Sequence, residues 1–186
     1  MNILKKAVLL IAVFILTLAT LVSCGSSAVP NGMTALEGEN LTYYIYVPKT
    51  WTAALSGGAV SAYAEDMSNV SVQTVAIPKD ADGKRLYSDV ADFWENGYRI
   101  SLGYTFAGAD YSETGEGKLG GEKSLTVEYT VKTFDISAKA EKNYSVKQII
   151  AEHGDNFYVI TYTAESANYG KHTDEFNSII SYFSFK

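Results

Sequence analysis

The sequence predicts an α+β domain in which a central antiparallel β-sheet is flanked by helices. Three observations support this fold class. From Leu41 onward, apolar and polar residues alternate as they do in half-buried strands. Two other segments place apolar residues at helical spacing. The elements also follow one another as several strands, a helix, several strands and a helix, which is typical of a sheet packed by segregated helices.

Four short strands are predicted in the first part of the domain, over 41–47, 49–55, 59–66 and 70–77. In the first, "LTYYIYV", alternation places Tyr44 and Tyr46 on the face opposite the other apolar side chains. Pro48 ends this strand, because proline cannot donate to a strand ladder. The turn-like Ser68-Asn69 separates the last two strands. Together, these segments predict two antiparallel hairpins.

The next segment has the period of a helix. Ser88 is a suitable N-cap, since a serine side chain can accept a hydrogen bond from the first helical turn. Six residues then occupy the positions of one helix face: Val90, Phe93, Trp94, Gly97, Tyr98 and Ser101. A second helix is predicted near the C-terminus, where Asp174 and Glu175 would lie at its positive end. Its apolar face would be formed by Phe176, Ile179, Ile180 and Phe183.

Three strands are predicted between the two helices. The glycine-rich "GEGKLGGEK" (115–123) predicts a turn. The strand after it, "SLTVEYTV" (124–131), has the clearest alternation in the chain. "YSVKQIIAE" (144–152) and "NFYVITYTAE" (156–165) predict two further strands, joined by a short turn.

The N-terminal 23 residues have the layout of an export signal. Lys5 and Lys6 precede an uncharged apolar run, 7–22, which is shorter than the roughly 20 residues of a membrane-spanning helix. The chain's one cysteine, Cys24, follows this run. A lone cysteine cannot form an internal disulfide, so a free thiol in an exported protein needs another explanation. Two alternatives remain open, namely a plain secretory signal with an incidental cysteine and an uncleaved membrane anchor.

"LVSC" (21–24) resembles the lipobox of bacterial lipoproteins. In that class the cysteine thiol receives a diacylglyceryl group and the signal is cut before the cysteine. The resemblance implies that 1–23 is a lipoprotein signal peptide and that Cys24 is the lipidated N-terminus. Two or more acyl chains hold a protein stably at a membrane, whereas a single chain does so only marginally.

The mature chain would contain 163 residues, enough for one domain with a real core. Removal of 1–23 removes two lysines and no acidic residue, so the formal net charge changes from −6 to −8. An acidic protein is a poor candidate for binding nucleic acid or anionic lipid headgroups. The small and polar residues that follow Cys24 predict a flexible tether over 24–39, and the folded domain is expected over 40–186.

The folded part resembles the PsbP-like domains of the Mog1/PsbP fold. Three segments carry the resemblance: "YYIYVPKTWT" (43–52), "LGGEKSLTVEYTV" (119–131) and "NFYVITYTAESANYGKHTDEFNSIISYFSF" (156–185). They match that family's opening aromatic strand, its strand after a glycine pair, and its closing strand and helix. The resemblance covers about residues 40–186.

The resemblance implies an α/β/α sandwich with helices on both faces of the sheet. Family members include extrinsic subunits of photosystem II, a Ran-binding nuclear transport factor and many bacterial lipoproteins. Most act as binding or assembly modules and share no catalytic residues. The photosystem role is not transferred, because nothing in this sequence supports it.

Motifs for catalysis or metal binding are weak. His153 falls in a predicted turn and His172 at a helix start, so both are expected at the surface. No G-x-S-x-G elbow is present. In "PKDADGK" (78–84), Asp80 and Asp82 are weak calcium candidates, since Pro78 cannot supply the first ligand of a calcium loop. Acidic pairs such as Asp92 and Glu95 are expected to be solvated. No catalytic residue, metal site or cofactor is therefore predicted.

The tyrosines are the remaining candidates for ligand binding. Tyr44 and Tyr46 share one strand face, and Tyr158 and Tyr162 share another. Tyrosine offers both apolar area and a hydroxyl group, which suits a binding surface. Core packing is the favoured interpretation, because helices on both faces of the sheet would bury these rings.

The sequence thus predicts a lipoprotein anchored by lipid to a bacterial cell membrane, with its domain on the extracytoplasmic side. In a cell with two membranes, the inner and the outer membrane both remain open. The domain is expected to act as a non-catalytic binding or assembly module for an envelope protein or a small ligand. The alternative is an envelope enzyme with an unrecognised active site.

Overall fold

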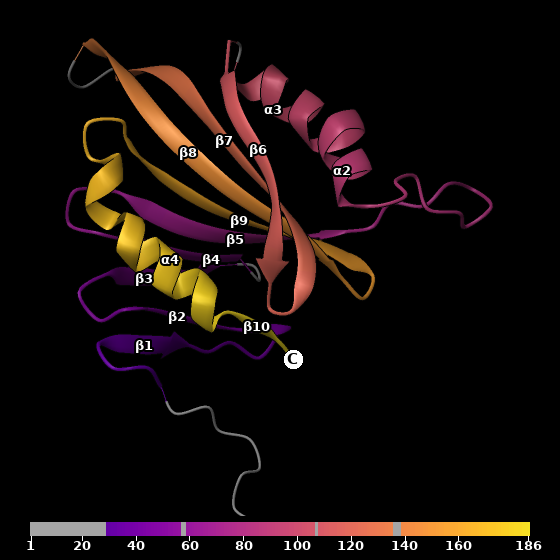
Figure 1. Ribbon diagram of the computed structural model, residues 1–186, viewed down its shortest axis with the longest axis horizontal. Helices are drawn as coiled ribbons and strands as arrows, with labels where there is room; N and C mark the ends of the chain where they lie inside the picture. Colours follow the sequence, from indigo (N-terminus) through magenta and orange to yellow (C-terminus); the bar gives the residue numbers. More distant parts are fainter. Residues whose placement is uncertain (1–28, 57–58, 107, 136–138) are drawn as a thin grey trace, which may run out of the picture.

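The computed structural model describes residues 29–56, 59–106, 108–135 and 139–186. The predicted signal peptide and Cys24 lie outside these ranges. A seven-stranded antiparallel sheet in the order β3-β4-β5-β9-β8-β7-β6 forms the centre of the domain (Figure 1). Its strands are β3 (Thr52–Ser56), β4 (Ala59–Tyr63), β5 (Asn69–Ala76), β6 (Asp110–Leu119), β7 (Glu122–Asp135), β8 (Ala140–His153) and β9 (Asn156–Glu165).

A second, three-stranded sheet closes one end of the domain. It contains β1 (Met33–Leu36), β2 (Tyr43–Pro48) and β10 (Ser184–Phe185), with β2 in the middle. Two predictions are corrected here. The strand 41–47 does not form a hairpin with the next strand, because β1 and β10 occupy both of its edges. The predicted tether also extends too far, since Met33 and Leu36 within 24–39 are buried in β1.

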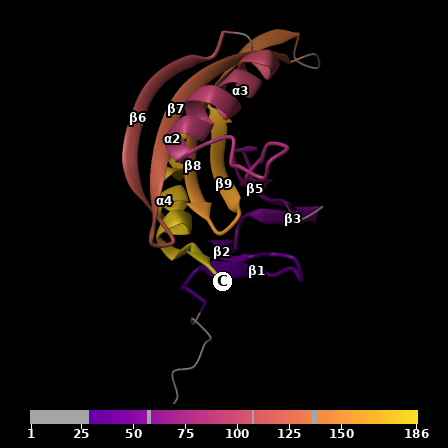
Figure 2. The ribbon, with the colours of Figure 1, turned by 90° about the vertical axis from the view of Figure 1, so that its right-hand side faces the viewer.

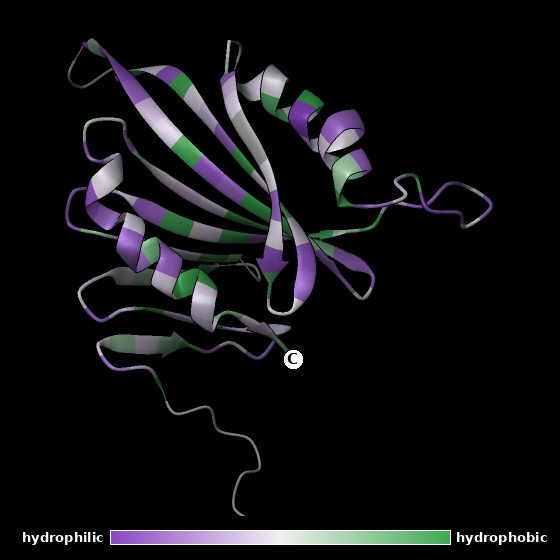
Figure 3. Cartoon of the chain, viewed as in Figure 1, coloured by the Kyte–Doolittle hydropathy of each residue, from purple (hydrophilic) through white to green (hydrophobic). Residues whose placement is uncertain are grey.

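Helices cover both faces of the large sheet, which confirms the predicted α+β class. Alternation along β9 sends successive side chains to opposite faces. Ile160 and Tyr162 pack in one core with Phe176 and Ile179 of α4 (Thr173–Tyr182), which the 3₁₀ turn η2 (Tyr169–His172) precedes. Phe157 and Val159 pack in the other core with the first helical segment. The resulting bands of hydrophobic and hydrophilic residues are visible along the strands (Figure 3).

The first helical segment consists of α2 (Val90–Phe93), the π-helical η1 (Trp94–Tyr98) and α3 (Arg99–Thr105). Its N-cap is Asp89 and not the predicted Ser88; the Asp89 carboxylate accepts a hydrogen bond from the Asp92 backbone at 2.9 Å. The long strands β6 and β7 arch around this segment (Figure 2). Phe93 and Trp94 are buried as predicted.

The π turn changes which residues of α3 face the sheet. A π turn contains more residues than an α turn, so the apolar face moves along the chain after it. Ser101, which regular α-helical spacing places on the inner face, is exposed. Leu102 is partly buried against the core instead.

The segment predicted as a turn over 115–123 is mostly strand. β6 continues to Leu119, and only Gly120 and Gly121 form the hairpin turn to β7. Both glycines have positive φ values, +57° and +95°, as a tight two-residue hairpin turn requires. The rest of this edge strand is largely exposed, so its sequence lacks the alternation that predicts strands.

Candidate functional site

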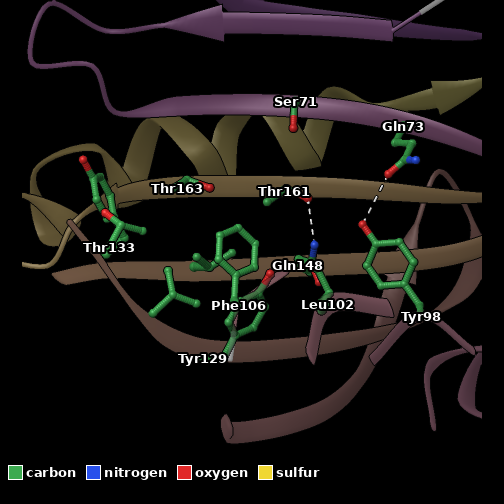
Figure 4. Close-up of a pocket in the computed structure, with 13 residues that line it drawn as sticks. Ser71, Gln73, Tyr98, Leu102, Phe106, Tyr129, Thr133, Gln148, Thr161 and Thr163 are labelled. Carbon is green, nitrogen blue, oxygen red and sulfur yellow. Dashed lines mark hydrogen bonds between the residues drawn. The ribbon is translucent and has the colours of Figure 1, made fainter. Parts of the chain in front are cut away.

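One cavity lies between the helical segment and strands β5, β7, β8 and β9 of the large sheet. Its volume is about 480 Å³, a size suited to a small ligand. We call it the Gln148 pocket; Figure 4 shows its lining. Strands β5, β7, β8 and β9 supply its floor, and Tyr98, Leu102 and Phe106 cover it from the helical segment.

One side of the floor is polar. Ser71 of β5 pairs with Thr161 of β9, which in turn pairs with Gln148 of β8. These three side chains therefore form a row across adjacent strands. Gln73, Thr133 and Thr163 extend the polar lining.

Gln148 is the buried end of this row, with 2% of its surface exposed. Its Nε2 donates a hydrogen bond to Thr161 Oγ1 at 3.1 Å (Figure 4). Its Oε1 is buried and has no hydrogen-bond partner among the residues that the structure describes. A buried acceptor without a partner costs about 1–3 kcal/mol, so this oxygen favours any molecule that can donate to it.

The other side of the pocket is apolar and aromatic. Its residues come from β7, β8 and the helical segment: Tyr129, Val131, Tyr144, Val146, Leu102, Phe106 and the ring of Tyr98. The lining is therefore richest in hydroxyl and amide groups over β5, β9 and Gln148, and richest in hydrocarbon and aromatic rings over β7 and the adjacent part of β8, where Thr133 is the exception. A molecule that lies across the strands would meet both surfaces.

None of the lining residues is an acid, a lysine, an arginine or a histidine. Burial raises the pKa of the Tyr129 phenol, with smaller contributions from Tyr98 and Tyr111. Burial also raises the pKa of Tyr98, whose hydroxyl donates to Gln73 Oε1 at 3.3 Å. Contact with the Gln148 amide opposes part of that rise. Both phenols are therefore neutral at pH 7, and the lining carries no ionised group.

This arrangement suits binding better than chemistry. General acid–base catalysis needs a group that titrates near the working pH, and the lining provides none. Its serine and threonines have no histidine or carboxylate beside them in the lining to activate them as nucleophiles. Over the described part of the chain, the His, Cys, Asp and Glu side chains form no group of three or more that could hold a metal ion.

The four tyrosines proposed from the sequence do not line this pocket. Tyr158 is buried, and its hydroxyl is 2.8 Å from Thr42 Oγ1. Tyr162 is also buried and donates to the Tyr169 carbonyl at 2.7 Å. These two rings pack in the α4-side core, as the favoured interpretation expected.

Tyr44 and Tyr46 lie apart from the pocket, on β2 of the small sheet. Tyr46 belongs to the α4-side core. Tyr44 is about half exposed, and Lys186 lies 5.1 Å from its ring centre. The four tyrosines are therefore not gathered into one surface.

The weak calcium candidates form a turn. Asp80 Oδ1 accepts hydrogen bonds from the backbone of Asp82 at 3.0 Å and of Lys84 at 2.8 Å. This pattern is an Asx-type turn, in which the carboxylate organises the loop itself. Asp82 is exposed.

The histidines each pair with carboxylates. His153 Nδ1 is 3.0 Å from Glu122 Oε1, and its ring stacks on Phe185. His172 lies between Asp66, at 3.3 Å, and Glu175, and the edge of its ring meets Trp51. Burial would raise the pKa of Asp66, but hydrogen bonds from Ser68 and the charge of His172 lower it overall. His172 thus links the β4–β5 loop to α4.

A sequence signal for Gln148 exists in the strand 144–152. Val146, Gln148 and Ile150 occupy successive inward positions, and the amide interrupts an otherwise apolar face. Thr161 and Thr163 interrupt the matching face of β9. A polar residue at an inward strand position marks either an internal hydrogen bond or a binding site. The paired strands place these interruptions side by side.

Comparison with known proteins supports the fold but not a family. The sequence matches no family model and no curated protein. Among solved structures, cyanobacterial PsbP from Synechocystis sp. PCC 6803 superimposes with a TM-score of 0.56 and 19% identity over 89% of this chain and 99% of that one. The chain has a PsbP-like fold. The fold predicted from the resemblance is therefore confirmed.

Two further structures are more distantly similar. LpqN of Mycobacterium tuberculosis, described as involved in cell envelope biogenesis, has a TM-score of 0.48 and 12% identity over 83% of this chain and 90% of LpqN. PA94 of Pseudomonas aeruginosa, of unknown function, has a TM-score of 0.47 and 13% identity over 78% of this chain and 92% of PA94. Within the described ranges, the protein has no helix with the length and apolar character needed to span a bilayer.

Substitution of Tyr162 by phenylalanine tests its structural role. We expect Tyr162→Phe to lower the free energy of unfolding by about 1 kcal/mol, because the Tyr169 carbonyl loses one of its two side-chain donors and keeps the hydroxyl of Thr173. Urea denaturation followed by tyrosine fluorescence measures this change. Tyr104→Phe, which removes a hydroxyl from a highly exposed ring, is the matched control and should leave stability unchanged. Equal stability of wild type and Tyr162→Phe would contradict the assignment.

Proposed function

We propose that this protein is a bacterial lipoprotein whose PsbP-like domain binds a small molecule, without catalysis, on the outer side of the cell membrane. A diacylglyceryl group on Cys24 would anchor it. The observation that carries the binding role is the Gln148 pocket, with its uncharged lining and its buried acceptor oxygen. The lipobox-like "LVSC" after an export-type apolar run supports the anchoring.

The short connection to Cys24 would hold the domain close to the membrane. Only eight residues separate Cys24 from Met33, the first residue of β1. Even a fully extended chain of that length spans no more than about 30 Å. β1 and α3 lie at opposite ends of the domain (Figure 1). The pocket would therefore lie on the part of the domain away from the membrane, where solutes have access to it.

Lipidation is tested by changing the cysteine. We expect Cys24→Ala to move the protein from the membrane fraction to the soluble extracytoplasmic fraction or to leave its signal uncleaved. The intact mass of the wild-type protein should correspond to residues 24–186 plus an acylated glyceryl group. Ser26→Ala, a matched small substitution two residues away, should remain in the membrane. A wild-type mass with an unmodified Cys24, or with residues 1–23 retained, would refute the anchor.

Ligand binding is tested by filling the pocket. Thr163 lines the pocket at an inward position of β9, and phenylalanine suits a strand, so Thr163→Phe should fold and occupy the cavity. The wild-type protein, purified from its native membranes and examined by native mass spectrometry, is expected to retain a small molecule. Thr163→Phe should retain less than about one tenth as much, since the ring removes the space for the ligand.

Thr74→Phe is the matched control for this experiment. Thr74 is exposed and lies on the same side of β5 as Val72, opposite the pocket face. This variant should retain the small molecule at the wild-type level. Absence of any retained molecule in wild type would contradict the proposal, as would equal retention by Thr163→Phe. Recovery of a stoichiometric protein partner without a small molecule would favour an assembly role instead.

A further inference from the structure

We infer that the ligand of the Gln148 pocket is an uncharged molecule with an apolar body and a hydrogen-bonding end group that donates an N–H or O–H. This inference rests on the proposed binding function and names the class of ligand. Three properties of the pocket carry it: the unpartnered Gln148 oxygen, the absence of charge in the lining, and the change from polar to apolar surface across the strands.

The end group must donate to Gln148 Oε1. The Gln148 amide nitrogen already donates one hydrogen bond to Thr161, whereas its Oε1 has no partner among the described residues, so the oxygen is the buried atom that still lacks a bond. Thr161 uses its oxygen as an acceptor in that bond and can still donate its own proton. An end group with a donor beside an acceptor would satisfy both side chains at once. A primary carboxamide meets this requirement, and an ester does not, because it has no donor.

The ligand must also be neutral. An ion transferred from water into this lining would lose its hydration and find no opposite charge among the lining residues. The Tyr98 and Tyr129 phenols remain protonated at pH 7 and supply no charge. A carboxylate end group would in addition place a negative charge against the Gln148 carbonyl oxygen. The pocket therefore discriminates between an amide and an acid of the same shape.

The apolar body would extend over β8 and β7. Val146 and Val131 provide the floor there, and Leu102 and Phe106 provide the cover. From Gln148 on β8 to Tyr129 on β7 the ligand crosses one strand spacing and runs two residues along the strands, or about 8 Å. An extended chain of eight carbon atoms spans this distance with its amide at Gln148 and Thr161, so octanamide is a suitable probe.

The experiment titrates octanamide, methyl octanoate and octanoate at pH 7 into the full mature protein with labelled methyl groups. NMR shifts of the Leu102 and Val146 methyl groups report binding in the pocket. We expect octanamide to bind at least about tenfold more tightly than methyl octanoate, and octanoate to bind most weakly. This comparison needs no variant, so it stays decisive if a substitution impairs folding.

Gln148→Met removes the acceptor while it keeps the length of the side chain. In this variant the affinity for octanamide should fall about tenfold, to the level of methyl octanoate. Thr74→Val is the control: it replaces a polar side chain by an apolar one on the opposite face of β5, outside the pocket lining. Its preference for octanamide should persist.

The outcomes separate this inference from the proposed function. Tightest binding of octanoate, or equal binding of octanamide and methyl octanoate to wild type, would overturn the assigned ligand class. Failure of all three probes to shift the pocket methyl groups would also overturn the assigned ligand class. The binding function would still stand if wild type retains a native small molecule that Thr163→Phe does not retain. Absence of both probe binding and a retained native molecule would overturn both.

Discussion

The structure depends on how a large sheet buries its two faces. α4 and the small sheet cover one face, where Val72, Ile160 and Tyr162 are almost completely buried. The helical segment on the other face is shorter than the strands beneath it. α2 and η1 cover Ile150, Phe157 and Val159, and the cover becomes thinner toward the end of α3. Burial of apolar area is the main favourable term in folding. Inward strand positions are therefore expected to be apolar where helices cover them, and can be polar where they do not.

β5 and β9 become polar where the cover becomes thinner, whereas β7 and β8 keep Tyr129, Val131 and Val146 on this face. On the α2 side of β9, Phe157 and Val159 give way to Thr161 and Thr163. On the same face of β8, the apolar Ile150 lies beside Val159, and the polar Gln148 lies beside Thr161, farther from α2. Ser and Thr can face solvent or a polar ligand at little cost, whereas an exposed row of large apolar residues would promote aggregation. The Gln148 pocket is therefore a consequence of incomplete cover, and it retains enough hydrocarbon from β7, β8 and α3 to hold an apolar group.

The π turn sets the shape of this pocket. By changing the helical phase after Trp94, it directs Leu102 and Phe106 toward the sheet and leaves Ser101 exposed. π turns are rare, and those that occur are often found at functional sites. Without this turn, the regular apolar face would present Ser101 to the sheet, and the pocket would lose part of its apolar cover.

Much of the fold was predictable from the sequence because most strands alternate strongly. The strand 124–131, the strands that became β8 and β9, and the C-terminal helix all have one clearly apolar face. The sequence pattern does not predict β6 or β1, for different reasons. β6 is an edge strand with few buried residues, and β1 is too short to show a period. One partner of β2, the strand β10, comes from the other end of the chain, and local patterns do not contain such a contact.

The candidate site was less accessible to prediction. Its residues come from β5, β7, β8, β9 and α3, and none belongs to a motif. The aromatic content favoured Tyr158 and Tyr162 as binding candidates, but both pack in the core. The residue that marks the site is Gln148, a single glutamine at an inward strand position. Whether Gln148 lies in a packed core or in a pocket depends on which helix residues cover it. Regular α-helical spacing does not predict these residues, because the π turn shifts the inner face of α3.

The orientation of a bound probe tests the central claim most directly. Intermolecular nuclear Overhauser effects between octanamide and the protein would locate both ends of the probe. We predict contacts from its amide protons to the Thr161 methyl group and from its terminal methyl group to Val146 and the Tyr129 ring. Contacts only with residues of the α4-side core or the small sheet, or the reverse orientation in the pocket, would contradict the account.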